Sequence, residues 1–424
     1  MSCVVQSVNV EGFWGSHSLT FDLHEDINFL IGVNGSGKTT LIKLISSALT
    51  GDFLTLDQID FQSIEIRLKR KTPYAKPYLR VEKKFLKKYQ YVEIILQVWP
   101  TASSQPLTFR QSDFLPMRYR RDLSFSKYRA RLAKSALEPL ETELTSLASI
   151  SWLAVDRKSD SEDDRSSSPP VDAKLDSLQL SLASFFSTLQ NSSEEEFKKF
   201  QHSILYSMLK PSTPENLFIS MLDLEIEEEE NSLLDVFREL GADAARGNRR
   251  INDHFKRVKE SIKKLRSEEE IDFSNLTALL SGWNLHQVVS AWHTLAETKE
   301  EIFRPQTMFI ALVNDFFQRK KLSVSKSNHL KVVTQSGKEL SPRELSSGEK
   351  QLLILLGEAL LQAGRTAVFI ADEPELSLHV EWQEKLVRSV RSLNPAAQII
   401  FATHSPDIVG PFQNRIVDME AIVE

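Results

Sequence analysis

The amino-acid sequence predicts an α/β fold that is interrupted by a helical insertion. In the first third of the chain, apolar and polar residues alternate with the two-residue period of strands, as in Val4–Val10. The middle of the chain changes to the three- and four-residue spacing of helices. From Thr307 to the end, strand-type and helix-type patterns alternate again. We therefore expect one α/β domain, formed by residues 1–165 and 306–424, with a helical insertion over residues 166–305.

The length and composition agree with this division. A chain of 424 residues is long for one ordinary domain, which favours a core domain with a sizeable insertion. No run of about 18 apolar residues is present, so we expect no membrane contact. The sequence starts without a secretory signal, and Cys3 is its only cysteine, which favours a cytoplasmic protein without disulfides or a cysteine-based zinc site. The net charge of −6 does not mark the whole chain as a nucleic-acid binder.

The first part of the chain contains several predicted strands and one predicted helix. Val4–Val10 and Ser18–Leu23 have the pattern of a hairpin, and the apolar run Ile27–Val33 is typical of a buried strand. Helical spacing follows over Thr39–Leu49. The segments SIEIRL and YVEIILQVW, between Ile64 and Val98, are predicted strands.

The insertion begins after a charged, serine-rich and proline-terminated linker, Lys158–Pro170. Two apolar seams then follow a heptad spacing, each over only about two heptads. The seams leave two alternatives open, namely ordinary amphipathic helices in a globular insert or a short, coiled-coil-like helical arm. The first seam is Leu175, Leu178, Leu182, Phe185 and Leu189, and the second is Ile251, Phe255, Val258, Ile262 and Leu265.

Residues 32–39, GVNGSGKT, match the pattern of a phosphate-binding loop between a strand and a helix. Glycines let such a loop curl until its N–H groups face the phosphates, and the helix N-terminus adds positive potential. Lys38 is expected to reach the β- and γ-phosphates, and the Thr39 hydroxyl is expected to bind Mg²⁺. The expected nucleotide-binding residues are Asn34, Gly35, Ser36, Gly37, Lys38, Thr39 and Thr40.

Two further strand ends carry candidate catalytic residues. The apolar strand Ala367–Ala371 leads directly into Asp372 and Glu373. A phosphate-binding loop needs an acidic partner for the magnesium ion, which assigns Asp372 to the metal, and Glu373 is placed to act as the general base for water. His404 follows the next apolar segment, Ala397–Ala402, where a sensor of the γ-phosphate is expected.

A third motif precedes the apolar helix Leu352–Leu361. Its residues are LSSGEKQ, and serine and glycine at a helix start form a second site for an anion.

The ordered set GVNGSGKT, LSSGEKQ, FIADEPELSLH and ATHSP resembles the ABC-type P-loop ATPases of the SMC, Rad50 and OLD group. The resemblance covers about residues 1–60 and 300–424 and implies ATP and Mg²⁺ as ligands, with ATP hydrolysis. It also implies a head-to-tail dimer, or a higher oligomer, in which the signature motif faces the γ-phosphate of the other subunit. Ser347 replaces a glycine of the usual motif. The signature residues are Ser346, Ser347, Gly348 and Glu349, and the D-loop residues, which would contact the other subunit, are Ser377, Leu378 and His379.

The same resemblance places the Q-loop at WLAVDRK, with Arg157 near the nucleotide, although this segment has no glutamine. Three absences distinguish the chain from individual members of this group. The insertion lacks the CxxC of a Rad50 hook, and 306 residues separate Thr39 from Leu345 (345 − 39), too few for an SMC arm. Only 20 residues follow His404 (424 − 404), so an OLD-type nuclease domain is not expected. The chain is most similar to stand-alone ATPase subunits of anti-phage defence systems such as PARIS and Septu, which implies a separate effector, for example a nuclease.

Direct DNA binding by a repair or chromosome-handling ATPase is the main alternative function. Two basic stretches, Arg67–Lys88 and Arg118–Lys134, are candidates for phosphate contact, and Tyr74, Tyr78, Phe85 and Tyr89 are interleaved with the first. Solvated strand and helix faces would give the same pattern. A non-catalytic nucleotide-dependent scaffold is disfavoured because Glu373 is present.

Overall fold

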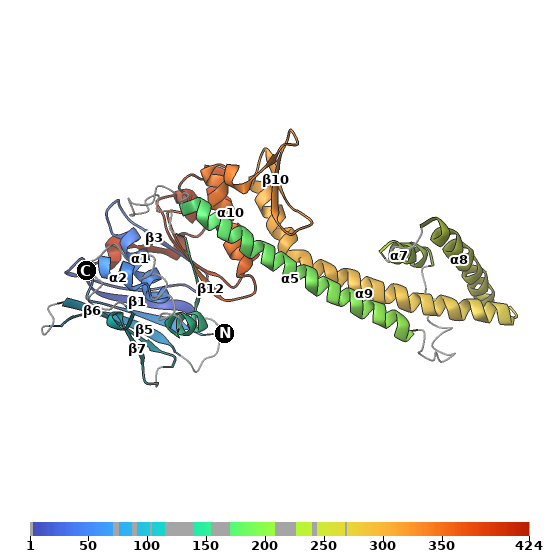
Figure 1. The fold of residues 1–424 in the computed structure, drawn as a ribbon, viewed down its shortest axis with the longest axis horizontal. Helices are drawn as coiled ribbons and strands as arrows, with labels where there is room; N and C mark the ends of the chain where they lie inside the picture. The colour runs from blue at the N-terminus through green and yellow to red at the C-terminus, as the bar shows by residue number, and fades with distance from the viewer. Residues whose placement is uncertain are drawn as a thin grey trace. The chain divides into compact units, whose positions relative to one another are not determined.

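The computed structural model describes residues 3–70, 76–86, 91–101, 104–114, 139–153, 170–207, 226–239, 244–267 and 269–423 (Figure 1). Contacts divide the chain into two units. The head unit is Met1–Ala183 with Met308–Glu424, and the helical unit is Ser184–Thr307. From the sequence we expect the helical insertion over residues 166–305, so the first boundary lies later in the structure, after Ala183.

The head unit contains an antiparallel sheet in the strand order β2-β1-β4-β5-β6-β7. The predicted hairpin is confirmed, because β1 and β2 pair in antiparallel register with Val8 opposite Phe21. The bounds of the strands are β1 (Val4–Phe13), β2 (His17–Asp22), β4 (Ser63–Lys69), β5 (Tyr78–Leu86), β6 (Tyr91–Trp99) and β7 (Leu107–Arg110), and two short helices, α2 (Phe53–Gln58) and α3 (Gln111–Phe114), complete this region.

A second, parallel sheet has the strand order β14-β3-β13-β12-β8. Because all its strands run in one direction, the loops that follow them leave from a common edge. These loops contain the P-loop after β3, the acidic pair after β12 and the segment with His404 after β13. The strands are β3 (Ile27–Ile31), β8 (Ser149–Leu153), β12 (Ala367–Asp372), β13 (Gln398–Ala402) and β14 (Ile416–Asp418).

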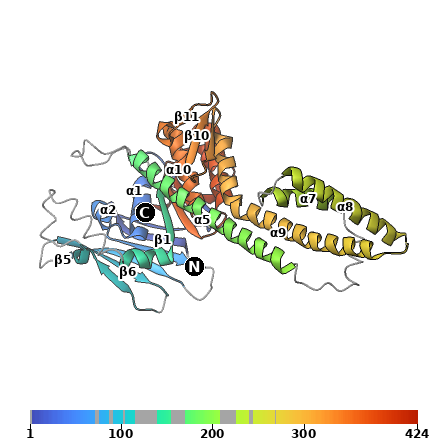
Figure 2. The ribbon, with the colours of Figure 1, turned by 45° about the vertical axis from the view of Figure 1, so that its right-hand side comes forward.

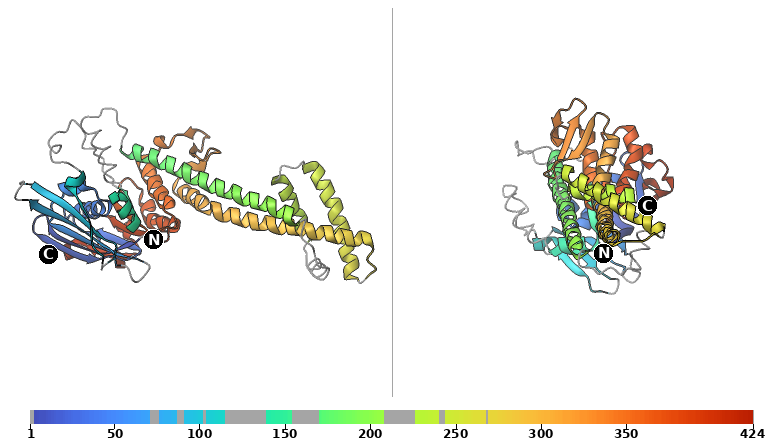
Figure 3. Two further views of the ribbon diagram at one scale, coloured as in Figure 1. Left: turned by 60° about the horizontal axis from the view of Figure 1, so that its bottom comes forward. Right: turned by 90° about the vertical axis from the view of Figure 1, so that its right-hand side faces the viewer.

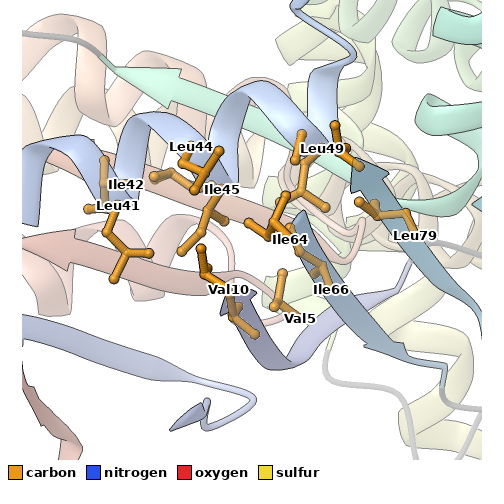
Figure 4. Packing of buried hydrophobic residues seen from close by; sticks show 14 of the residues in the cluster. Val5, Val10, Leu41, Ile42, Leu44, Ile45, Leu49, Ile64, Ile66 and Leu79 are labelled. Carbon is orange, nitrogen blue, oxygen red and sulfur yellow. The ribbon is translucent and has the colours of Figure 1, made fainter. Parts of the chain in front are cut away.

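Helix α1 (Lys38–Thr50) connects the P-loop to the core of the head unit. Its apolar residues, including Leu41, Ile45 and Leu49, pack against buried residues of the antiparallel sheet, such as Val10 and Ile64 (Figure 4). Burying one such side chain stabilises a fold by roughly 1.5–3 kcal/mol. The start of α1, where phosphates are expected, is therefore anchored in the core of the head unit.

The remainder of the head unit follows the helical unit in sequence. Helix α10 begins directly after the signature serine, and α11 begins directly after the D-loop. The elements are the three-stranded sheet of β9 (Lys320–Val324), β10 (Leu330–Thr334) and β11 (Glu339–Leu340), and the helices α10 (Ser347–Leu361), α11 (Val380–Leu393), α12 (Pro406–Val409) and α13 (Met419–Ile422).

The first turns of α5 (Pro170–Ser207) belong to the head unit because they pack on α10. Leu178 is buried against Gly357, where an added Cβ would lie 2.8 Å from a Leu178 methyl carbon. Asp172 forms an ion pair with Lys350 at 2.7 Å, and Asp176 pairs with Arg343. These contacts explain why the boundary lies at Ala183.

The helical unit contains α7 (Ile226–Glu239), α8 (Ala244–Arg266), and parts of α5 and α9 (Phe273–Phe316). Helices α7 and α8 lie side by side (Figures 1 and 2). The second predicted seam is confirmed: Ile251, Phe255, Val258 and Ile262 are buried, and Leu265 packs against them. Helices α5 and α9 also run side by side, with the Phe200 and Trp292 rings 5.8 Å apart (Figure 3).

One detail of the helical prediction was wrong. The buried aromatic residue of the first seam is Phe186, whereas Phe185 is only partly buried, because the face shifts by one position along α5. The alternating pattern expected from Thr307 begins within a helix, because α9 continues to Phe316 and the first strand begins at Lys320. None of the described helices has a stretch that is both long and apolar enough to cross a membrane.

Candidate nucleotide site

The P-loop joins the end of β3 to the start of α1, and its glycines are required by its shape. Gly35 and Gly37 have φ values of +86° and +91°, in the left-handed region that residues with a Cβ rarely adopt. A Cβ at Gly37 would also lie within 3.0 Å of the Phe13 and Trp14 rings. At Gly35 nothing lies within 4 Å of the Cβ position, so this part of the loop is open to a ligand.

Lys38 is buried and points back into the loop. Its Nζ donates hydrogen bonds to the carbonyls of Gly32 at 2.9 Å and Val33 at 3.1 Å. Burial lowers the pKa of Lys38, while the negative charges of Glu373 and Asp372 act in the opposite direction. The ammonium group is thus partly desolvated, and phosphate oxygens would be stronger acceptors for it than the two carbonyls.

Ser36 supplies a second indication that the loop fits an anion. Its Oγ is buried, and within the described part of the chain it has no hydrogen-bond partner. Buried hydroxyl groups are normally paired, so an unpaired one beside an open loop fits a site for an exogenous acceptor.

Thr39 and Asp372 come together at the expected metal position. The Thr39 hydroxyl donates to Asp372 Oδ1 at 3.1 Å, although 333 positions separate the two residues. Asp372 is the last residue of β12, and Thr39 lies in the first turn of α1. A hydroxyl and a carboxylate are hard oxygen donors of the kind that Mg²⁺ prefers, so these residues fit that ion.

Glu373 and His404 face each other beside this position. Glu373 Oε1 lies 3.9 Å from His404 Nε2, and both side chains are about one third exposed, at 32% and 37%. Glu373 has a φ of +46°, which is uncommon for a residue with a side chain. Its N–H donates to the Ala402 carbonyl at 2.8 Å, so the end of β13 helps to hold this conformation.

Glu375 is a site residue that the sequence analysis did not predict. Its Oε1 accepts hydrogen bonds from the Thr403 hydroxyl at 2.6 Å and from the His404 N–H at 2.9 Å. Glu375 therefore positions the backbone of the segment that carries His404. The only signal in the sequence was that another acidic residue, Glu375, follows shortly after the Asp372–Glu373 pair.

The signature residues form the start of α10. Ser346 is the N-cap, and its side chain accepts a bond from the Glu349 N–H, while Glu349 Oε2 accepts from the Ser346 N–H at 2.8 Å. Lys320 pairs with Glu349 at 2.7 Å. Burial acts to raise the pKa of Glu349, but the bonds from Lys320 and Ser346 outweigh it and hold the pKa below its ordinary value. Anionic oxygen already lies at this helix start, as its dipole favours.

The D-loop contacts the signature helix of the same chain. A Cβ at Gly348 would lie 2.2 Å from the Ser377 carbonyl oxygen, so only glycine allows this approach. Ser377 has a φ of +74°, Leu378 is buried, and His379 is the exposed N-cap of α11. One function of Gly348 is therefore to admit the D-loop backbone, which its motif alone did not indicate.

Comparison with known proteins identifies the family. Residues 27–410 match the family described as "AAA domain, putative AbiEii toxin, Type IV TA system". The chain belongs to this family. It thus contains an AAA-type domain, which agrees with a P-loop, the Thr39–Asp372 contact and an adjacent glutamate at one sheet edge.

Among curated proteins, the chain is similar to the "Retron Vc95 probable ATPase" of Vibrio cholerae serotype O1 biovar El Tor, with 26% identity over 186 residues. The match covers 38% of this chain and 36% of that protein, so the chain spans about a third of the length of the curated relative.

Solved structures similar to the chain include an Smc head domain with an extended coiled coil, bound to the C-terminal domain of ScpA, from Pyrococcus furiosus. This structure has 12% identity, covers 98% of this chain and 93% of its own, and gives a TM-score of 0.42. An Smc head domain with a coiled coil and joint from Pyrococcus yayanosii has 11% identity, 98% and 95% coverage, and a TM-score of 0.41.

The AAA domain brings some predicted residues together and leaves others apart. The P-loop, the acidic pair and His404 meet at one edge, whereas no hydrogen bond or ion pair among the described residues joins signature residues 346–349 to the P-loop. Strand β8 ends beside β12, with Leu153 opposite Ala371, so the predicted Q-loop follows the strand next to the acidic pair. Arg157 itself lies outside the described residues.

An open pocket of about 660 Å³ lies beside the first half of the P-loop. It is bounded by the loop that carries His404 and by the C-terminal segment around β14. Its lining includes Gly32, Val33, His404, Ser405, Asp418 and Glu420.

Proposed function

We propose that the chain binds Mg²⁺ and ATP at the P-loop and hydrolyses ATP, with Glu373 as the general base and His404 as the γ-phosphate sensor. The observation that carries this proposal is the 3.1 Å contact between Thr39 and Asp372, with Glu373 and His404 facing each other on the adjacent loops.

Each residue then has a defined role. Residues Asn34–Thr40 hold the phosphates, with Lys38 exchanging its two carbonyl partners for β- and γ-phosphate oxygens. Glu373 accepts a proton from water as the water oxygen bonds to the γ-phosphorus, and the bond to the β–γ bridging oxygen breaks, which gives ADP and phosphate. Thr39 and Asp372 would hold Mg²⁺, which supplies positive charge to the phosphates when bound.

A steady-state assay tests this function directly. Purified protein should release phosphate from ATP in the presence of Mg²⁺, and chelation of the metal should abolish the release. A protein that binds ATP but releases no phosphate under any condition, including high protein concentration, would contradict the proposed activity.

We further propose that two copies pair head to tail and enclose the nucleotide, with Ser346, Ser347, Gly348 and Glu349 of one copy facing the P-loop of the other. The absence of a bond between signature and P-loop among the described residues of one chain supports this arrangement, as does the anion-binding character of the start of α10. The D-loop residues Ser377, Leu378 and His379 would then lie at the contact between the copies.

The biological role that we propose is control of a separate effector, such as a nuclease, in anti-phage defence. The family description names a Type IV TA system, and the curated relative is named a retron "probable ATPase". Both support a role in which ATP turnover controls a toxic partner. Co-purification of this chain with the product of a neighbouring nuclease gene, and loss of phage resistance on deletion of either gene, would test the role.

Direct DNA binding is a second candidate function, and α8 favours it. Six basic residues, five of them exposed and Lys264 half-buried, follow its polar face in two rows that repeat every seven positions, Arg249/Lys256/Lys263 and Arg250/Arg257/Lys264. By contrast, described basic residues of the first sequence stretch are largely compensated: Arg67, Arg80 and Lys84 pair with Glu65 or Glu82. The second stretch, Arg118–Lys134, lies outside the described residues.

A further inference from the structure

Five hydrogen bonds form a closed ring behind the candidate site. Glu375 Oε1 accepts from the Thr403 hydroxyl at 2.6 Å, and Thr403 Oγ1 accepts from the Ser405 N–H at 2.9 Å. The Ser405 hydroxyl donates to Gln383 Oε1 at 2.6 Å, and Gln383 Nε2 donates to the Leu378 carbonyl at 3.0 Å. The Leu378 N–H donates to the Glu375 carbonyl at 2.9 Å, which closes the ring.

The ring connects two loops that are distant in sequence. One is the D-loop, residues 377–379, and the other is the switch loop, which we define as residues 403–405. Gln383, in the first turn of α11, contacts both loops with the two ends of its amide. The amide supplies an acceptor for Ser405 and a donor for Leu378 at the same time, whereas a carboxylate of the same length has no donor and an alkyl group has neither.

The ring also contacts the groups that the proposed reaction uses. Glu375, which belongs to the ring, accepts a hydrogen bond from the His404 N–H. Glu373, the proposed general base, lies two positions before Glu375 in the chain. At the other end, Ser377 has a φ of +74° and its carbonyl lies against Gly348 of the signature helix. Gln351 of that helix donates to the Pro374 carbonyl at 3.1 Å, which holds the same segment from the opposite side.

We propose that Gln383 is a positioning residue that ties the switch loop to the D-loop, so that the two loops move together when the γ-phosphate is bound or released. This inference rests on the proposed ATPase function. His404 would register the nucleotide in its own subunit, and the ring would transmit that state to the D-loop, where a second copy is expected to pack. Gln383 touches neither the nucleotide nor the reacting atoms.

Gln383→Leu tests the tie, and Glu384→Leu is its matched control. Both changes replace a polar side chain of similar size by leucine on the same turn, but Glu384 is exposed and forms no bond in the ring. We expect Gln383→Leu to bind ATP with nearly unchanged affinity, to lower kcat by about tenfold or more, and to weaken ATP-dependent dimer formation. Glu384→Leu should leave all three quantities at wild-type values.

Two further variants separate positioning from simple destabilisation. Gln383→Glu keeps the acceptor for Ser405 but loses the donor to Leu378, so it should lower kcat although the switch loop stays tied to α11. Ser405→Ala removes the hydroxyl that donates to Gln383 Oε1. The double variant Gln383→Leu/Ser405→Ala should be as active as the less active of the two single variants, because both changes open the same ring.

The outcomes distinguish this inference from the proposed function. If the wild-type protein hydrolyses ATP and the Gln383→Leu and Gln383→Glu variants are equally active, the proposed tie between the two loops is overturned, but the proposed ATPase function is not. If both Gln383 variants had a lower melting temperature and a lower ATP affinity but an unchanged kcat at saturating ATP, the role of Gln383 would be merely structural. This result would also overturn the tie. A wild-type protein that does not hydrolyse ATP would overturn the proposed function, and this inference with it.

Discussion

Glu373 combines an unusual backbone conformation with a position beside the expected γ-phosphate. A left-handed φ at a residue with a Cβ is disfavoured by about 1–2 kcal/mol. Its φ of +46° is held by the bond from its N–H to the Ala402 carbonyl and by the Leu376 N–H, which donates to the Glu373 carbonyl at 3.1 Å. Strain of this kind collects where a side chain must point in a fixed direction, which supports the role proposed for Glu373.

Glu373→Gln should retain ATP binding and suppress hydrolysis by at least about 100-fold, because general-base catalysis typically contributes that much. The amide keeps the shape of the side chain and leaves Asp372 in place, so the ATP-bound dimer should become long-lived. Phosphate release and light scattering in ATP measure the two effects. A variant that turns over ATP at the wild-type rate would assign the base elsewhere.

Lys38→Ala should abolish or strongly weaken ATP binding. The change removes the main positive charge at the β- and γ-phosphates and leaves the Gly32 and Val33 carbonyls, which now accept from Lys38, facing the site. Titration with a fluorescent ATP analogue measures the affinity, and a melting curve without nucleotide checks the fold. Unchanged affinity in a folded variant is incompatible with the P-loop assignment.

Residues in contiguous motifs were predictable from the sequence, and residues that act through long-range bonds were not. The P-loop pattern predicts the positions of its glycines and of Lys38 because neighbours in sequence form the loop. Glu375 and Gln383 bond to partners 28 and 22 positions away, and no local pattern specifies such pairs. The proximity of Thr39 and Asp372 was expected only because both motifs follow strands of one predicted sheet.

At the scale of elements, heptad spacing predicted which helix faces are buried but not what covers them. Leu175, Leu178 and Leu182 are three of the five residues of one predicted seam and are all buried, yet the contact of Leu178 is with Gly357 of the head unit. The same spacing would suit a partner helix of the insertion, because an apolar stripe does not specify its partner. The boundary between the head unit and the helical unit therefore lies later in the chain than the composition of the linker suggested.

This packing changes the design of a deletion. Removing residues 184–307 and joining the ends with a flexible glycine–serine bridge should leave ATP binding intact, because the contacts of Asp172, Asp176 and Leu178 with the head unit are kept. A deletion that starts at Lys174 should lower the melting temperature further, since it also removes Leu175 and Leu178 from the core. Nucleotide titration and melting curves compare the two. Loss of ATP binding in the shorter, folded deletion would place the helical unit within the nucleotide site.

Helix α8 allows the DNA alternative to be tested with a matched control. Arg250, Lys256 and Lys263 are exposed and form no ion pair with a described residue. Their replacement by Glu should weaken duplex DNA binding and reduce the slope of log affinity against log salt by up to about 3, since each lost phosphate contact removes about 0.9. Titrations between about 50 and 200 mM salt provide this slope.

The control is the equivalent triple change on the head unit, Arg319→Glu, Lys326→Glu and Lys338→Glu, which alters the net charge by the same amount at exposed positions. It should leave the salt slope near the wild-type value. Equal effects of both triple variants would indicate a general charge effect, and wild-type protein without measurable DNA affinity at low salt would exclude α8 as a DNA contact.

For the whole molecule, the parallel sheet explains how three separate motifs, the P-loop, the acidic pair and the segment with His404, form one site. Strands β3, β13 and β12 are neighbours in the sheet although β3 is separated from β12 by more than 300 residues, since β3 ends at Ile31 and β12 starts at Ala367. Patterns in the sequence predicted the strands but not their order. The order matters because it places the switch loop between the P-loop and the acidic pair. The signature contacts this arrangement only through the D-loop, where Gly348 lies against the Ser377 carbonyl among the described residues. The signature residues are therefore left for the second copy that we expect.

Complementation between two inactive variants tests this arrangement. Ser346→Arg places a long cation where the signature would approach the other subunit, so we expect near-normal ATP binding and lost hydrolysis. Lys38→Ala has an intact signature but a defective P-loop. In a two-fold dimer each composite site uses the P-loop of one copy and the signature of the other, so a mixed dimer keeps one good site of two. An equal mixture with free exchange should recover about a quarter of wild-type activity, because about half of its dimers are mixed.

Ser346→Ala separates the cap of α10 from the contact with the other copy. Both substitutions at this position remove the side chain that accepts the Glu349 N–H, and loss of an N-cap destabilises a helix by about 1 kcal/mol. If hydrolysis fails only because α10 is weakened, Ser346→Ala should be as inactive as Ser346→Arg, and Lys38→Ala should rescue neither. If the head-to-tail arrangement holds, Ser346→Ala should keep much more activity, and the mixture of Ser346→Arg with Lys38→Ala should exceed both parents. Exchange of subunits, followed by energy transfer between labelled copies, must accompany the assay, because only then does an inactive mixture count against the shared site.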